Sequence, residues 1–152
     1  MMEEKEKAWK TVSSKYLFRR PWLTVRCEDM LLPNGNHIPE YYILEYPDWV
    51  NTIAITKDGK FVFVRQYRPR LGRTSYELCA GVCDKEDASP LVSAQRELWE
   101  ETGYGKGNWQ EYMVISANPS THTNLTHCFL ATNVEPIDHQ HLEDTEDLSV
   151  HL

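Results

Sequence analysis

Residues Ser89 to Tyr104 read Ser-Pro-Leu-Val-Ser-Ala-Gln-Arg-Glu-Leu-Trp-Glu-Glu-Thr-Gly-Tyr. Pro90 suits the first position of a helix, because its missing N–H would have no partner there, and Ser89 suits the N-cap before it. Gly103 suits the position just past the far end, where the backbone turns left-handed. The stretch therefore predicts a helix over about residues 90–102.

The predicted helix separates its acidic residues from its apolar ones. At 100° per residue, one narrow face carries Glu97, Glu100 and Glu101, and another carries Leu91, Ala94 and Leu98. A solvated acidic face is one interpretation, although like charges at this spacing repel by a few tenths of a kcal/mol per pair. A divalent cation would reverse that repulsion. Oxygen ligands without His or Cys favour Mg²⁺ or Mn²⁺.

Residues Arg96 to Tyr104 resemble the second half of the Nudix box, whose full form is G-x5-E-x7-R-E-U-x-E-E-x-G-U with U aliphatic or aromatic. The matching positions are Arg96, Glu97, Leu98, Glu100, Glu101, Gly103 and Tyr104. The first half departs from the pattern, because Gly81 stands fifteen residues before Arg96 where the box has fourteen. The loop thus carries one extra residue, and the acidic position falls to either Glu86 or Asp87.

The segment before the helix, Glu77-Leu-Cys79-Ala80-Gly81, resembles the E-L-P-A-G motif of ADP-ribose pyrophosphatase-like Nudix enzymes, with Cys in place of Pro. Gly81 is expected to permit a tight turn and a close backbone approach. The resemblance implies that Ala80 offers its carbonyl oxygen to a metal. For Glu77 three roles stay open, namely a structural role, pairing with an arginine, and contact with substrate.

An arginine-rich segment precedes this motif, with Arg65, Arg68, Arg70 and Arg73. A solvated loop is one interpretation. Guanidinium groups also bind phosphate or carboxylate oxygens bidentately, which would suit a phosphate substrate. The resemblance to the subfamily's V-R-Q-Y/F-R segment favours Arg65 and Arg68 as substrate ligands.

Two later segments also resemble that subfamily. Pro119 lies fifteen residues past Tyr104, where a proline accompanies ADP-ribose pyrophosphatases, and a plain loop proline is the alternative. Residues 143–147 resemble the segment E-x-E-D/N-I-x-V, or they form a plain acidic loop. The resemblance implies that Glu146 helps bind metal and that Asp144 is the base for the attacking water.

Composition narrows the function classes. The chain has 152 residues, 41% hydrophobic and 26% charged, which is ordinary for a globular protein. A net charge of −7 argues against a nucleic-acid or anionic membrane surface. The start is hydrophilic and no apolar run approaches the roughly 18 residues of a membrane span, so a cytoplasmic protein is expected. The four cysteines are expected to be reduced, and the spacing of Cys79 and Cys83 does not suit zinc.

The strand patterns predict a small β-unit followed by a larger domain. Apolar and β-rich runs cover residues 13–18, 22–30, 41–46, 50–56, 61–66, 109–115, 127–132 and 148–152. The resemblance implies that residues 1–46 form an N-terminal lead and β-unit, which commonly contributes to a homodimer in the subfamily. It further implies that residues 47–152 form the Nudix catalytic domain, an α/β/α sandwich around a mixed sheet, here without the family's closing C-terminal helix.

The implied chemistry is hydrolysis of a diphosphate. Mg²⁺ or Mn²⁺, held by Glu97, Glu100, Glu101, Glu146 and the Ala80 carbonyl, would neutralise a diphosphate and lower the pKa of a water. Arg96 would orient the carboxylates, with Glu100 as its partner one turn away. The expected substrate is a nucleoside diphosphate linked to another moiety, with ADP-ribose giving AMP and ribose 5-phosphate. Alternatives are an ADP-sugar, GDP-mannose, a nucleoside triphosphate, or a non-catalytic nucleotide-binding or regulatory module.

Overall fold

The computed structural model describes residues 7–152, and the chain forms two compact units. The first unit contains the described residues up to Tyr46 together with Ala117–Asn124. The second contains Pro47–Ser116 and Leu125–Leu152. Across the described part of the chain, no helix combines the length and the apolar character needed to cross a membrane.

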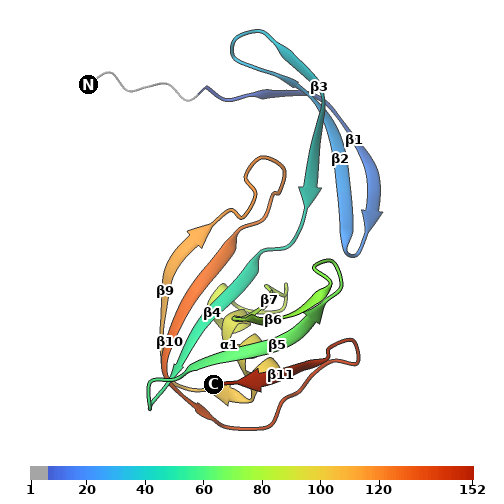
Figure 1. The fold of residues 1–152 in the computed structure, drawn as a ribbon. Helices are drawn as coiled ribbons and strands as arrows, with labels where there is room; N and C mark the ends of the chain where they lie inside the picture. Colours follow the sequence, from blue (N-terminus) through green and yellow to red (C-terminus); the bar gives the residue numbers. More distant parts are fainter. Residues whose placement is uncertain (1–6) are drawn as a thin grey trace, which may run out of the picture. The chain divides into compact units, whose positions relative to one another are not determined.

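The first unit is built on a three-stranded antiparallel sheet in the order β1-β2-β3 (Figure 1). Its strands are β1 (Lys10–Arg20), β2 (Leu23–Leu31) and β3 (His37–Glu45). The segment Ala117–Asn124 is hydrogen-bonded to β3, because Leu44 donates its N–H to Thr121 at 2.8 Å and accepts from Thr123 at 3.1 Å. The predicted N-terminal β-unit is therefore present, and a loop from late in the sequence belongs to it.

The second unit is a mixed sheet with one helix, which confirms the predicted α/β class. Its elements are β4 (Trp49–Thr56), β5 (Phe61–Arg68), β6 (Arg73–Glu77), β7 (Cys79–Val82), α1 (Pro90–Thr102), β8 (Tyr104–Gly105), β9 (Asn108–Ile115), β10 (Thr126–Pro136) and β11 (Leu148–His151). The sheet follows the order β11-β5-β4-β10-β8, with β6 beside β5, β7 beside β4 and β9 beside β10. Only β4 and β10 pair in parallel among the described strands, and they form the centre of the sheet (Figure 1).

Both ends of α1 have the predicted caps. Ser89 is extended, and its hydroxyl accepts the Val92 N–H at 3.4 Å. Gly103 adopts the left-handed conformation with φ of 73°, and its N–H donates to the Trp99 carbonyl at 2.8 Å. The cap residues thus fix the helix at Pro90–Thr102, as the sequence predicts.

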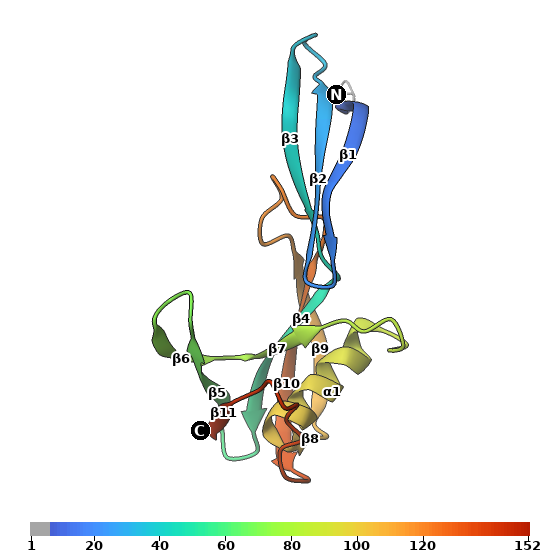
Figure 2. The same cartoon turned by 90° about the vertical axis from the view of Figure 1, so that its right-hand side faces the viewer.

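One face of the sheet packs against α1 (Figure 2). Along β4 every second residue is buried, so the strand presents one face to the helix. Leu98 and Ala94 of α1 are fully buried there. Leu91, which was expected on the same apolar face, is 36% exposed. The buried face of the helix instead includes Ser93, Glu101 and Thr102, because it runs along positions 94, 98 and 101.

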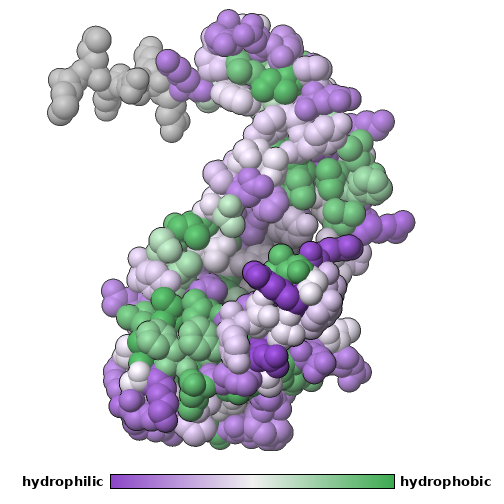
Figure 3. Space-filling model, viewed as in Figure 1, coloured by the Kyte–Doolittle hydropathy of each residue, from purple (hydrophilic) through white to green (hydrophobic). Residues whose placement is uncertain are grey.

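The opposite face of the sheet carries the alternate side chains of the same strands. They include Ile53, Ile55, Phe61 and Phe63. Phe61 and Phe63 stack with ring centroids 6.1 Å apart. The space-filling view shows apolar side chains gathered over the sheet of the second unit on this side (Figure 3). Since α1 is the only helix among the described residues, the second helical layer of a sandwich does not occur in this part of the chain.

The Ser89 cap is expected to contribute measurably to stability. Ser89→Ala removes the side-chain acceptor for the Val92 N–H, and losing such a cap costs about 1 kcal/mol. Urea unfolding followed by circular dichroism measures the change. Gln95→Ala, at an exposed position in the middle of the same helix, is the control and should leave the unfolding midpoint nearly unchanged. Equal stabilities for wild type and Ser89→Ala would contradict the capping role.

Candidate functional site

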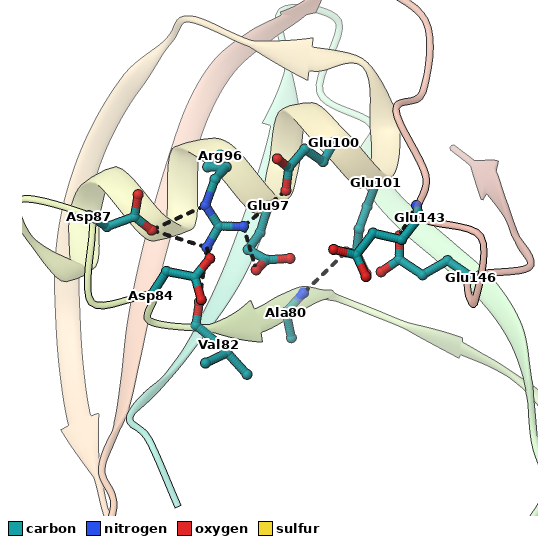
Figure 4. Close-up of polar contacts among 10 residues, drawn as sticks. All are labelled: Ala80, Val82, Asp84, Asp87, Arg96, Glu97, Glu100, Glu101, Glu143 and Glu146. Atoms are coloured by element: carbon teal, nitrogen blue, oxygen red, sulfur yellow. Dashed lines mark hydrogen bonds and ion pairs between the residues drawn. The ribbon is translucent and has the colours of Figure 1, made fainter. Parts of the chain in front are cut away.

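Arg96 lies at the centre of a group of carboxylates on and beside α1 (Figure 4). Its Nη1 donates to Glu97 Oε1 and to Glu100 Oε2, both at 2.9 Å. Its Nη2 donates to the Val82 carbonyl at 3.0 Å, which ties the helix to β7. The ion pair expected between Arg96 and Glu100 is therefore present. Although partial burial opposes it, these anionic partners raise the pKa of Arg96 above its ordinary value.

The loop before the helix supplies further carboxylates to the same guanidinium. Asp87 Oδ2 accepts from Arg96 Nε at 3.1 Å and from Nη2 at 3.0 Å. Asp84 Oδ2 lies 3.2 Å from Nη2. Glu86 is exposed, so of the two residues that the sequence left open, Asp87 is the one brought to the helix. The sequence motif does not predict a role for Asp84, and the acidic composition of its loop is the only sequence signal for this contact.

Glu101 is the most buried carboxylate of the group, at 5% exposure. It accepts the Ala80 N–H at 3.3 Å. Burial raises the pKa of Glu101 from an ordinary value of 4.5 to about 7, and the nearby Cys79 thiol and the Ala80 N–H oppose this rise. Glu97 and Glu146 repel its charge and raise the pKa further. A proton or a cation is therefore favoured at this position.

Glu97 is held under similar conditions. Burial raises the pKa of its carboxyl, Arg96 opposes that rise, and the charges of Glu100 and Glu146 add to it. Its carboxylate lies against Gly81 of β7, where a Cβ atom would overlap it. Gly81 pairs with Val50 inside the strand. The tight turn expected at Gly81 is therefore wrong, whereas the expected close approach is present and explains the glycine.

Glu146 reaches the group from the loop between β10 and β11 (Figure 4). Its Oε2 accepts the Glu143 N–H at 2.9 Å, and its own N–H donates to the Glu143 carbonyl at 3.0 Å. Its charge acts on both Glu97 and Glu101. The resemblance implied that Glu146 joins the helix carboxylates, and the structure brings it there. Asp144 lies in the same loop with its side chain exposed.

The arginine-rich segment forms the end of β5 and the turn into β6. Arg68 Nε and Nη2 donate to the Glu77 carboxylate at 2.6–3.1 Å. This contact lowers the pKa of Glu77. Of the roles left open for Glu77, pairing with an arginine is the one the structure shows. Arg65 is exposed on β5, with its guanidinium 5.8 Å from the Tyr76 ring centroid. Pro119 belongs to the first unit and not to the unit that holds the carboxylates.

The charges of the group do not balance. Glu97 and Glu100 contact the Arg96 guanidinium, which Asp87 already shares, and Glu101 and Glu146 add two further negative charges that act on Glu97 or on each other. All these donors are oxygens, which suit a hard divalent cation such as Mg²⁺ better than zinc. The same excess of negative charge contributes to the raised pKa values of Glu97 and Glu101, since burial and mutual repulsion both disfavour the charged carboxylate. The residues present therefore fit a bound hard divalent cation.

Two family models match consecutive parts of the chain. The model of the nucleoside diphosphate sugar hydrolase N-terminal domain matches residues 9–44, and that of the NUDIX domain matches residues 46–151. Together they cover both units.

Three characterised proteins are similar along most of the chain. An ADP-ribose pyrophosphatase of Bacillus subtilis is 30% identical over 91% of this chain and 74% of its own length. The methanol dehydrogenase activator of Bacillus methanolicus is 33% identical over 80% of this chain and 65% of its own. An ADP-ribose pyrophosphatase of Mycobacterium tuberculosis is 28% identical over 87% of this chain and 63% of its own. The chain thus spans about two thirds to three quarters of the length of these relatives.

A solved structure has the same fold. The crystal structure of an ADP compounds hydrolase superposes with a TM-score of 0.82, covering 97% of this chain and 80% of that one, at 21% identity. At that identity the likeness concerns the fold, which it confirms.

Proposed function

The chain belongs to the Nudix family, and from this we propose that it is a Mg²⁺-dependent hydrolase of a nucleoside diphosphate linked to another moiety. The leading substrate is ADP-ribose, cleaved between the two phosphates to give AMP and ribose 5-phosphate. The observation that carries the proposal is the excess of carboxylates on and beside α1: Glu97 and Glu100 share the Arg96 guanidinium, and Glu101 and Glu146 add further negative charge. Similarity to two ADP-ribose pyrophosphatases supports the substrate.

The metal would be held by these four glutamates and by the carbonyl oxygen of Ala80. When bound, Mg²⁺ supplies charge neutralisation for the diphosphate and lowers the pKa of a water. Arg96 offsets the mutual repulsion of Glu97 and Glu100 and fixes their orientation toward β7. Gly81 leaves the space that the Glu97 carboxylate occupies. These contacts fix the ligand side chains before any substrate arrives, which reduces the cost of organising them.

Substrate binding and proton removal are assigned to residues outside the helix. Arg65 and Arg68 are proposed to bind the phosphates, with Glu77 orienting the Arg68 guanidinium through its bidentate contact. Asp144, exposed in the loop of Glu146, is proposed as the base that takes the proton of the attacking water. Pro119 is proposed as a further substrate-binding residue, on the strength of its place in the sequence alone.

Product release from a small substrate panel tests the proposal. ADP-ribose, ADP-glucose, GDP-mannose, diadenosine tetraphosphate and dGTP are each incubated with the chain, with Mg²⁺ and with a chelator. AMP is expected from ADP-ribose in clear preference, and only with Mg²⁺. Preferred cleavage of a nucleotide sugar or a triphosphate would support the proposed hydrolysis but would contradict ADP-ribose as the substrate. Equal release with chelator would contradict the metal-dependent mechanism.

A regulatory module is the second candidate, because one relative bears the name methanol dehydrogenase activator. On that hypothesis the chain binds a nucleotide derivative without turning it over. Calorimetric binding of ADP-ribose in Mg²⁺, with no AMP released by the same sample, would favour this candidate over the hydrolase.

Mg²⁺ is expected to stabilise the folded chain more strongly at about pH 8 than at about pH 6. Burial raises the pKa of Glu101 to about 7 in the metal-free fold, above its unfolded value. The stability gained from its proton is therefore complete below the unfolded pKa and is lost as the pH rises through about 7. Mg²⁺ replaces that proton, and about a hundredfold excess over its Kd stabilises the fold by about 2.7 kcal/mol. The Tm in Mg²⁺ and in chelator at both pH values measures the difference.

Glu135→Gln is the control for this pH dependence. Glu135 is a carboxylate of the same unit that contacts Lys57 and Lys106 instead of the helix group. Its substitution should leave the Mg²⁺-dependent rise in Tm unchanged at both pH values. If Mg²⁺ raises the wild-type Tm equally at the two pH values, Mg²⁺ does not replace a proton on Glu101.

A further inference from the structure

A second group of metal-binding side chain types lies in the loop that follows β10. Asp138, His139 and His141 each place one ligand atom so that these atoms all lie within 4.8 Å of one another. Within residues 7–152 this is the one group of three or more His, Cys, Asp or Glu side chains whose ligand atoms all lie so close together. It is separate from the carboxylates around Arg96, since it contains two imidazoles and a single carboxylate.

The loop that carries the group is fixed to the end of α1. The N–H groups of Ile137 and Asp138 donate to the Gly103 carbonyl at 2.9 and 3.2 Å. The His141 N–H donates to the Glu100 carbonyl at 2.8 Å. The Gln140 side chain donates to the Glu101 carbonyl at 2.7 Å. These hydrogen bonds hold the loop in place beside the carbonyl end of a helix, where a cation is favoured.

The three side chains already contact one another through the atoms that bind metals. Asp138 Oδ1 lies 2.7 Å from His139 Nδ1, and Oδ2 lies 3.0 Å from His141 Nε2. The two imidazole rings are 4.3 Å apart between centroids. Asp138 and His139 are exposed and His141 is half-buried, so an ion reaches the group from solvent. A cation between these atoms would replace the imidazole–carboxylate contacts without moving the backbone.

We propose that Asp138, His139 and His141 form a site for one divalent transition-metal ion, with Zn²⁺ as the reference ion. Two imidazole nitrogens and one carboxylate oxygen are ligands that Zn²⁺ accepts in a tetrahedral site with water in the fourth position. Imidazole nitrogen distinguishes this site from the all-oxygen group that suits Mg²⁺. The ion would strengthen the contacts of the loop with the carbonyls of Glu100 and Glu101. The proposal does not depend on the hydrolase activity.

Calorimetric titration of Zn²⁺ into untagged, metal-stripped chain in excess Mg²⁺ tests the site. Saturable binding of one Zn²⁺ per chain is expected. Asp138→Asn and His139→Ala are each expected to weaken it at least about tenfold. His37→Ala is the matched control, because His37 Nδ1 contacts Asp29 Oδ1 at 3.1 Å as a single imidazole–carboxylate pair. It should leave the affinity unchanged.

Trp99 provides an independent readout, since its ring stands 4.2 Å from that of His141. Cu²⁺ binding to the same ligands is expected to quench Trp99 fluorescence, and Trp99→Phe should remove the quenched component. His139→Gln replaces His139→Ala if circular dichroism shows that the latter does not fold. The proposal is overturned if excess Mg²⁺ abolishes Zn²⁺ binding in the wild type, or if Asp138→Asn and a folded His139 variant bind Zn²⁺ as the wild type does.

Discussion

Replacing Glu101 by Gln is expected to lower turnover of the preferred substrate by about 100-fold or more, equivalent to about 2.7 kcal/mol of transition-state stabilisation. Glu101 is the carboxylate that the fold buries most deeply in the group, between β7 and the helix. Gln keeps an oxygen that accepts the Ala80 N–H, and it has the same shape. The change therefore removes the negative charge that the metal needs and little else. Initial rates at saturating Mg²⁺ and substrate measure the loss.

The stability of the same variant separates lost chemistry from lost folding. Above about pH 7 the metal-free wild type carries a buried charge at Glu101, close to that of Glu97. The amide of the Glu101→Gln variant has no such charge, so the metal-free variant is expected to unfold at a Tm equal to or above that of the wild type. Mg²⁺ should raise that Tm less than it raises the wild-type Tm. Near-normal turnover in Glu101→Gln, or a variant that loses activity because it is unfolded, would contradict this role.

Local sequence signals predicted the helix and the carboxylates on it. The caps at Ser89 and Gly103 act within a few residues, and the 3.6-residue period brings Glu97 and Glu100 to one guanidinium. The strands followed from apolar alternation and turn residues in the same way. Features of this kind need no knowledge of distant residues, and the structure confirms the helix and has a strand at each predicted run.

Features that depend on how distant segments meet were beyond the sequence. Gly81 was expected to turn, but it is a strand residue whose missing side chain accommodates Glu97 from the helix. The sequence did not determine whether Glu86 or Asp87 contacts the helix, because that depends on the path of a loop with one extra residue. Asp138, His139 and His141 are close in the sequence, but the conformation that turns these side chains toward one another belongs to a loop whose backbone is hydrogen-bonded to the end of α1.

Replacing Arg96 by Ala is expected to cost roughly 2–3 kcal/mol in the free energy of unfolding of the metal-free chain. The Arg96 side chain is 24% exposed, and its guanidinium is shared by Asp87, Glu97 and Glu100. Its loss leaves these carboxylates to repel one another and frees the Val82 carbonyl from its donor. The cost is below that of a fully buried ion pair because water reaches one side of the group. Urea unfolding at about pH 8 in chelator measures it, where the carboxylates are charged.

Mg²⁺ distinguishes a role in charge balance from a role in packing. If Arg96 mainly offsets the carboxylates, excess Mg²⁺ takes over part of that role and recovers part of the lost stability. Arg96→Lys should fall between the wild type and Arg96→Ala, because an ammonium keeps the charge but does not reach several partners in one plane. Arg70→Ala, at an exposed arginine in the turn between β5 and β6, should leave stability nearly unchanged. If Mg²⁺ does not reduce the loss of stability in Arg96→Ala, Arg96 acts mainly in packing the helix on β7 and not in balancing the charges of the metal ligands.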